Sequence, residues 1–212
     1  VYIDHIDSSM KHIEHKILNL KEGSMRLRYE YLLEKQDKTW LYCSFVNKKL
    51  RKNTLFIQEI DQTTCQRIGE LRKITEIDFS SYKAPGQFHF TYSTIGNDFI
   101  VFAQDPKSNS TGIVVNMLVM SPDLTTKETQ HITWNTTVGS LKFKNVFYDG
   151  NGSLIFFARN LISGEYVFYH KTNKEESLKK EIISAKGKSI SDVEVYWNKD
   201  KITCHGLYRE TM

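Results

Sequence analysis

The sequence contains little proline and little cysteine. Its 212 residues include three prolines, and no linker rich in proline, or in glycine and serine, divides the chain into halves. The three cysteines, Cys43, Cys65 and Cys204, cannot all pair within one chain, and none lies in a CxxC motif or at zinc-finger spacing. We interpret all three as small apolar residues of strands.

Long apolar runs and the common catalytic motifs are also missing. No run of about 18 apolar residues occurs, so we expect no membrane-spanning helix. The sequence has no G-x-S-x-G elbow and no Walker loop. Net charge is only +4, from 29 basic and 25 acidic residues, which gives no specific nucleic-acid signal. A hydrophobic share of 40% is sufficient for a core and excludes global disorder.

A repeated hairpin is the clearest positive signal. The stretch "NVFYDGNGSLIFFARN" (145–160) has the pattern of a strand, a polar turn and a more apolar strand. Asn, Asp and Gly tolerate the positive φ angles that tight hairpin turns need. The same pattern returns in three other segments, 26–46, 88–104 and 192–208.

A second pair of strands follows three of these hairpins. Each pair is an apolar strand, a polar turn and a more polar strand, in segments 54–74, 112–134 and 165–184. Residues 65–74 and 177–186 could also form short helices, but their place in the repeat favours strands. The fourth such pair is found at the other end of the chain, in residues 1–20.

The repeat is therefore four strands and about 50 to 55 residues long, which is typical of a propeller blade. We predict an all-β fold of antiparallel four-stranded repeats, β-propeller-like, in a single domain over residues 1–212. It would have four composite blades or be a fragment of a larger propeller; a stack of meanders or a β-sandwich is the alternative. The expected blades are 24–75, 86–135, 139–185, and 188–212 completed by 1–20. In this last blade, Val1–Leu20 pairs with Asp192–Tyr208 and covers exposed strand edges.

Two segments resemble a known class of proteins. "ISDVEVYWNKDKITCHGLYRE" and "SLKFKNVFYDGNGSLIFFAR" are similar to degenerate β-propeller-like proteins of Bacteroidetes, which are largely uncharacterised. The matching motifs are Asp149-Gly150-Asn151-Gly152 and Gly206-Leu207-Tyr208. The resemblance implies a propeller fold, favours a periplasmic, cell-envelope or secreted location, and assigns no catalytic residue. Because the chain starts at Val1, we expect that a preceding segment, such as a signal peptide, could be missing.

Two patterns partly match metal sites. In "HIEH", His12 and His15 have the spacing of a helical metal pair, with His5 nearby, but in a strand the two side chains point to opposite faces. "DGNGS" (149–153) begins like a calcium loop, but Leu154 and Asn160 occupy the positions that need Gly and Glu. We therefore expect no metal site and no cofactor.

Basic residues concentrate in "NKKLRKN", which contains Lys48, Lys49, Arg51 and Lys52. This loop is either a solvated turn or a docking patch for a protein or anionic ligand. In a propeller it would share a rim with loops 82–87, 105–112 and 160–165, which add Lys107.

The function predicted from these features is a non-catalytic binding or scaffold module. The alternative is a hydrolase whose polar groups converge at a central channel.

Overall fold

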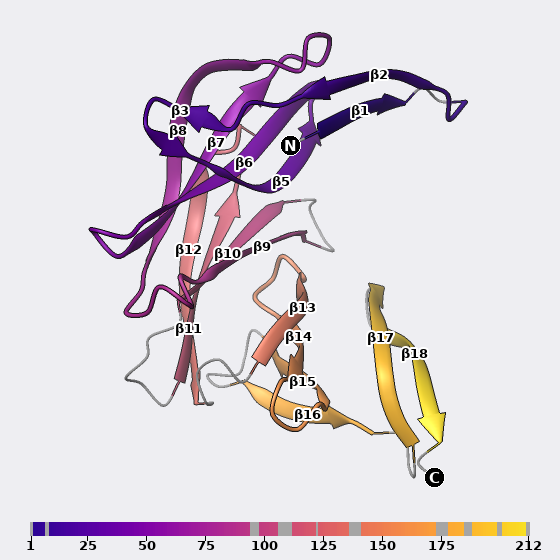
Figure 1. Cartoon of the computed structure of the whole chain (residues 1–212). Helices are drawn as coiled ribbons and strands as arrows, with labels where there is room; N and C mark the ends of the chain where they lie inside the picture. Colours follow the sequence, from indigo (N-terminus) through magenta and orange to yellow (C-terminus); the bar gives the residue numbers. More distant parts are fainter. Residues whose placement is uncertain are drawn as a thin grey trace. The chain divides into compact units, whose positions relative to one another are not determined.

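The computed structural model describes residues 2–6, 9–93, 98–105, 112–121, 123–135, 141–172, 178–184, 188–198 and 201–210. These residues form eighteen strands and no helix (Figure 1). In this part of the chain, no helix is present that is long and apolar enough to cross a membrane. The chain divides into two compact units, Val1–Asp78 and Phe79–Met212, and each is described by itself.

Unit 1, the segment Val1–Asp78, contains eight strands. They are β1 (Tyr2–Ile6), β2 (His12–Ile17), β3 (Lys21–Glu22), β4 (Met25–Arg26), β5 (Arg28–Lys35), β6 (Lys38–Asn47), β7 (Lys52–Ile60) and β8 (Arg67–Asp78). β5 to β8 form a four-stranded antiparallel sheet in chain order, while β1–β2 and β3–β4 are two-stranded hairpins.

Unit 2, the segment Phe79–Met212, contains ten strands. They are β9 (Gln87–Tyr92), β10 (Phe99–Asp105), β11 (Gly112–Met120), β12 (Thr126–Asn135), β13 (Leu141–Tyr148), β14 (Leu154–Asn160), β15 (Tyr166–Lys171), β16 (Lys179–Ile183), β17 (Lys188–Asn198) and β18 (Lys201–Glu210). β9–β12 and β13–β16 are two further four-stranded antiparallel sheets, and β17–β18 is a two-stranded sheet.

Three four-stranded antiparallel meanders confirm the predicted fold class, all-β and propeller-like with four-stranded repeats. Segments 65–74 and 177–186, which could have been helices, contribute to strands β8 and β16. The number of blades and the closure of a ring stay predictions.

The hairpin turns explain why the strands reverse where they do. Between β5 and β6, Gln36 and Asp37 both have positive φ angles, 54° and 57°, as a two-residue type I′ turn requires. Between β13 and β14, the Asp149 carboxylate accepts hydrogen bonds from the backbone N–H groups of Asn151 (2.7 Å) and Ser153 (2.9 Å). This self-contained turn accounts for "DGNGS" without an ion.

The core of unit 2 lies between stacked sheets. One apolar cluster joins β9–β12 to β13–β16 and includes Phe102 and Phe156, whose ring centroids are 5.6 Å apart. A second cluster, on the opposite face of β13–β16, joins Phe157 to Val193 and Val195 of β17. The first strands of the two four-stranded sheets, β9 and β13, are neighbours, and a parallel bridge connects Ser93 to Tyr148. First strands of neighbouring blades lie beside one another in this way around a propeller's central channel.

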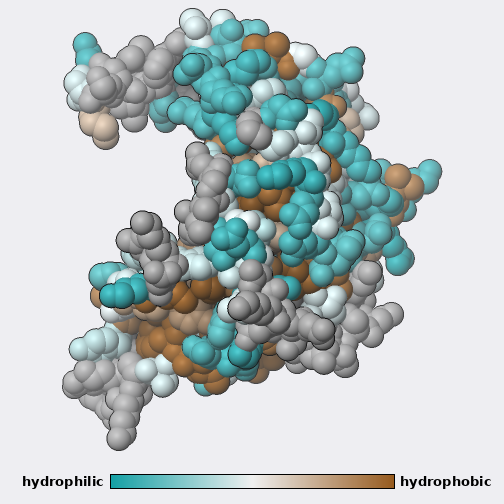
Figure 2. Space-filling model, turned by 180° about the vertical axis from the view of Figure 1, so that it is seen from behind, coloured by the Kyte–Doolittle hydropathy of each residue, from teal (hydrophilic) through white to brown (hydrophobic). Residues whose placement is uncertain are grey.

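On the face that Figure 2 shows, unit 2 is more apolar than unit 1. Figure 2 shows hydrophobic residues gathered over the part of unit 2 that carries β13–β18, while the visible face of unit 1 is mostly hydrophilic. On β18, the apolar side chains of Ile202, Leu207 and Tyr208 are exposed. Within the described residues, β18 pairs only with β17 and β1 only with β2, so the predicted completion of β17–β18 by Val1–Leu20 stays a prediction.

The three cysteines differ in their surroundings. Cys43 is fully buried in β6, and burial raises the pKa of its thiol to about 12. Cys204 is exposed in β18. Cys65 is not a strand residue, so that prediction is wrong: it lies in the β7–β8 turn with φ 55°. The turn forms because the Asp61 carboxylate accepts hydrogen bonds from the N–H groups of Thr63 and Thr64.

Candidate anion-binding groove

The β3–β4 hairpin of unit 1 places two cations opposite each other. Gly23, with φ 56°, makes the tight turn, and the register pairs Lys21 directly with Arg26. Like charges at directly opposite strand positions repel each other and destabilise the pair. A hairpin of two-residue strands cannot offset this repulsion by itself, so other contacts must hold it in place.

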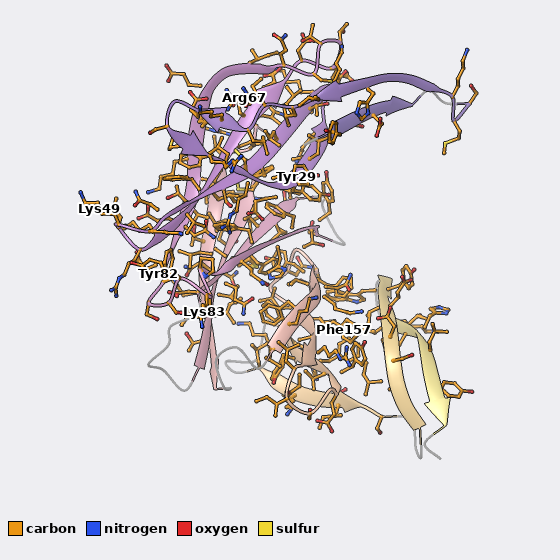
Figure 3. The ribbon with its side chains drawn as sticks, in the orientation of Figure 1. Tyr29, Lys49, Arg67, Tyr82, Lys83 and Phe157 are labelled. Atoms are coloured by element: carbon orange, nitrogen blue, oxygen red, sulfur yellow. The ribbon has the colours of Figure 1, made fainter. Side chains whose placement is uncertain are left out.

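Arg67 supplies those contacts from the start of β8. Its guanidinium lies 3.0 Å from the Glu22 carboxylate and donates hydrogen bonds to the Lys21 carbonyl (2.8 Å) and the Gln58 side-chain oxygen (3.2 Å). The side chain is only 16% exposed. Figure 3 shows Arg67 beside this hairpin. Arg67 therefore fixes the hairpin to the four-stranded sheet and neutralises its only acidic residue.

A groove of about 1000 Å³ opens next to this hairpin, within unit 1. Four cations line it: Lys21, Arg26, Arg28 and Lys48. Among the described residues, the rest of its lining is Asn19, Tyr29 and apolar residues, with no aspartate or glutamate. None of the four cations forms an ion pair within 4 Å with another residue of the described chain. We call this site the cationic groove.

One acidic residue lies close behind the groove without lining it. The Glu30 carboxylate accepts a hydrogen bond from the Ser44 hydroxyl, and Arg28 acts on it electrostatically. Burial raises the pKa of Glu30, while Ser44 and Arg28 oppose that rise. Glu30 is therefore engaged by Ser44 and does not line the groove, and Arg28 forms no ion pair within 4 Å in the described part of the chain.

The predicted basic loop forms the β6–β7 turn at one side of the groove. The Asn47 side-chain oxygen accepts the Leu50 N–H (3.0 Å), and Arg51 closes the turn with φ 54°. Lys48, Lys49 and Arg51 are exposed and form no ion pair in the described part of the chain. Figure 3 shows Lys49 at the tip, pointing away from the sheet.

Lys52 differs from the other three residues of the loop. It is the first residue of β7, its ammonium donates a hydrogen bond to Glu76, and it lies 3.8 Å from Asp78. The hydrogen bond to Glu76 raises the pKa of Lys52. The structure therefore leaves Lys48, Lys49 and Arg51 available to a partner and engages Lys52 within the fold, and only Lys48 lines the groove.

Sequence reasoning missed Lys21, Arg26, Arg28 and Tyr29. A signal for them was present: Arg26 and Arg28 alternate in "RLRYEY", which places them on one side of an extended chain. The Gly-Ser pair in "KEGSMR" would have predicted a tight turn and the pairing of Lys21 with Arg26. The sequence did not reveal that Lys48, which lies in a distant segment of the chain, lines the same groove.

The other sites predicted from the sequence do not form a binding site in the described residues. The His15 imidazole lies 2.6 Å from the Asp4 carboxylate, while the side chains of His5 and His12 are outside the described residues. In the described ranges, no group of three His, Cys, Asp or Glu side chains could hold a metal ion. Lys107 also lies outside these ranges. The four loops expected on one rim belong to both units, so their shared rim stays a prediction.

The chemistry available in the cationic groove is the binding of negative charge. Guanidinium and ammonium groups donate charge-assisted hydrogen bonds to carboxylates and phosphates. Tyr29, on β5, adds a phenol that is 46% exposed. Partial burial and the neighbouring Tyr31 raise the pKa of Tyr29 further above neutral pH, where a tyrosine hydroxyl is protonated and can donate a hydrogen bond.

Comparisons with known proteins give no family. No family model matches the sequence, and no curated protein matches it. Among solved structures, the chain is similar to an endo-arabinase from Bacteroides thetaiotaomicron VPI-5482, at 9% identity and a TM-score of 0.47, over 95% of this chain and 81% of that one. It is also similar to prolyl oligopeptidase B from Galerina marginata, at 12% identity and a TM-score of 0.40, over 88% of this chain and 27% of that one. Both are of the β-propeller type. Similarity at this level says nothing about the function of this chain.

Proposed function

We propose that this chain is a non-catalytic binding module whose cationic groove binds an acidic segment of a partner protein. The observation that supports this proposal is the composition of the groove: four cations line it and no acidic side chain does. Cations that face one another without counter-charges raise the free energy of the unbound protein. An anionic partner relieves that repulsion, which favours binding.

The extent of the positive surface supports a protein segment over a small anion. The β6–β7 turn adds Lys49 and Arg51 next to Lys48, so that positive charge continues past the groove. A single phosphate or carboxylate would contact only part of this surface. A chain segment with several carboxylates can contact both the groove and the turn, and complementary charge also speeds its association.

The hydrolase alternative stays a prediction. It requires groups that act as acid, base or nucleophile and converge at a central channel. The charged side chains of the cationic groove are instead cations with no base among them, so no feature of this site favours hydrolysis.

The proposal is tested with a poly-L-glutamate probe. Binding is measured by isothermal titration calorimetry at about 0.1 M ionic strength, where long-range charge effects are screened, for the wild type and for Arg26→Gln/Arg28→Gln/Lys48→Gln. We expect the triple variant to bind at least about tenfold more weakly, because three charge-assisted contacts are lost.

The matched control is Lys142→Gln/Lys180→Gln/Lys201→Gln, which removes the same charge from exposed positions of unit 2. It should bind within about twofold of the wild type, because none of its three positions lines the groove. An equal loss of affinity in both triple variants would show that binding depends on the total positive charge and not on the groove, and would overturn the proposal.

A further inference from the structure

The cationic groove is also an apolar surface. Besides its cations it is lined by Ile17, Leu18, Leu20, Leu27, Phe45 and Val46. Ile17 is 71% exposed, whereas Leu18 and Leu27 are buried. Pure anion sites do not need exposed aliphatic side chains, so this second property requires its own partner.

The apolar lining is anchored and does not depend on a partner for its position. Leu18 and Leu27 are 3% and 4% exposed and belong to a core cluster with Leu41 and Cys43. A backbone hydrogen bond from the Leu27 N–H to the Leu20 carbonyl (2.8 Å) joins the two chain segments that border the groove. Ile17 and Tyr29 are therefore presented to solvent from a fixed floor, which lowers the entropy cost of binding.

Charge and apolar area occur in the same groove. Lys21 and Arg26 face each other across the hairpin, and Arg28 adjoins Tyr29 in the chain. A partner that carries only carboxylates would satisfy the cations and leave Ile17 and Tyr29 in water. A partner that carries only apolar groups would remove the cations from water without counter-charges, which costs free energy.

We infer that the acidic segment bound by the groove is amphipathic: it carries a large apolar side chain, such as leucine, flanked on both sides by carboxylates. This inference rests on the proposed function and names the chemistry of the partner. The carboxylates contact the cations and speed association, while the apolar side chain packs against Ile17 and Tyr29 and slows dissociation.

Two synthetic peptides of equal length test the inference. One has a central leucine between runs of glutamate, and the other has serine in place of that leucine. We expect the wild type to bind the leucine peptide about tenfold more tightly than the serine peptide, as measured by fluorescence anisotropy. The preference should persist as salt is raised, because apolar contacts are not screened.

The variant Ile17→Ser/Tyr29→Ser should lose this preference and keep its affinity for the serine peptide. Both positions are exposed, so the substitutions should leave the fold intact. The matched control is Ile162→Ser/Tyr82→Ser, which replaces an exposed isoleucine (78%) and tyrosine (56%) of unit 2 and should keep the preference.

Each failure has a distinct reading. Equal affinity of the wild type for the two peptides would overturn the amphipathic partner and leave the proposed function standing. No binding of either peptide or of poly-L-glutamate would overturn the proposed function, and the inference with it. A preference that survives in Ile17→Ser/Tyr29→Ser would place the apolar contact outside the groove.

Discussion

Two sets of cations in unit 1 have opposite surroundings. Arg67 and Lys52 are each paired with carboxylates, Glu22 for the first, Glu76 and Asp78 for the second. Arg26, Arg28 and Lys48 line the cationic groove and form no ion pair in the described part of the chain. The first set stabilises the fold, and the second set is available to bind another molecule.

The backbone near the groove cations shows why these cations are not needed to stabilise the fold. Gly23 makes the β3–β4 turn through its positive φ angle, and the Asn47 side chain caps the β6–β7 turn. Gly23 and Asn47 shape these two turns, and Arg67, which does not line the groove, fixes the β3–β4 hairpin to the sheet. The two sets should therefore respond differently to mutation, in stability and in binding.

The largest effect is expected for Arg67→Ala. It removes an ion pair and two hydrogen bonds from a side chain that is only 16% exposed. We expect the free energy of unfolding to fall by about 2 kcal/mol, measured by urea denaturation. Arg28→Ala, with no ion pair, should change it by less than about 0.5 kcal/mol. Equal losses in the two variants would contradict the division into two sets.

A second prediction extends the contrast from charges to strands. β14 and β18 are both second strands of their hairpins, but β14 is paired on both sides, whereas β18 pairs only with β17 in the described chain. If Val1–Leu20 completes β17–β18, removal of residues 1–10, including β1, should lower the melting temperature by a few degrees and cause aggregation through the open edge. This deletion keeps Leu18, which is buried in unit 1. An unchanged melting temperature and a monomeric variant would show that the predicted completion is wrong.

The groove cations themselves should be replaceable at little cost. The free energy of unfolding of Arg26→Gln/Arg28→Gln/Lys48→Gln should lie within about 0.5 kcal/mol of the wild-type value. It could be slightly higher, because the repulsion between Lys21 and Arg26 is removed. Urea denaturation at low salt is the measurement. A large loss of stability would mean that these cations belong to the structural set.

The smallest effect is expected for the stability of the protein at low pH. Lys52 and then Lys73 donate hydrogen bonds to Glu76 and lower the pKa of its carboxyl below the ordinary value of 4.5. A lowered pKa in the folded state adds stability above the unfolded pKa, and this stability is lost as pH falls through the folded pKa. Because the carboxylate is only partly buried and solvent screens its ion pairs, the effect should be small. Stability measured from pH 6 down to 3 should therefore fall slightly more steeply in the wild type than in Glu76→Gln; identical curves would contradict this role.

The strands could be predicted because their signals are local. Gln36-Asp37 and the Asp149 turn reverse the chain through residues adjacent in sequence, and the strands alternate in polarity at period two. Cys65 was misassigned because an aspartate four positions earlier, Asp61, makes the turn that contains it. That signal was also local, and the repeat pattern obscured it.

The groove could be predicted only in part, for a different reason. Lys48 was predicted from a dense run of basic residues, but its groove neighbours Lys21, Arg26 and Arg28 lie at or before the start of β5, about 20 residues or more earlier in the chain. Lys52, in the same run, is neutralised by Glu76 because β7 pairs with β8. Which cations are paired depends on strand register, and charge density along the chain does not reveal it.

The salt dependence of binding tests the central claim most directly. The affinity of wild type, groove variant and unit 2 control for poly-L-glutamate is measured from low to high ionic strength. We predict a steep loss of affinity with salt for the wild type and the control, and a shallower loss for Arg26→Gln/Arg28→Gln/Lys48→Gln, because fewer ion pairs form. The same slope in all three proteins would contradict the claim that the cationic groove is the binding site.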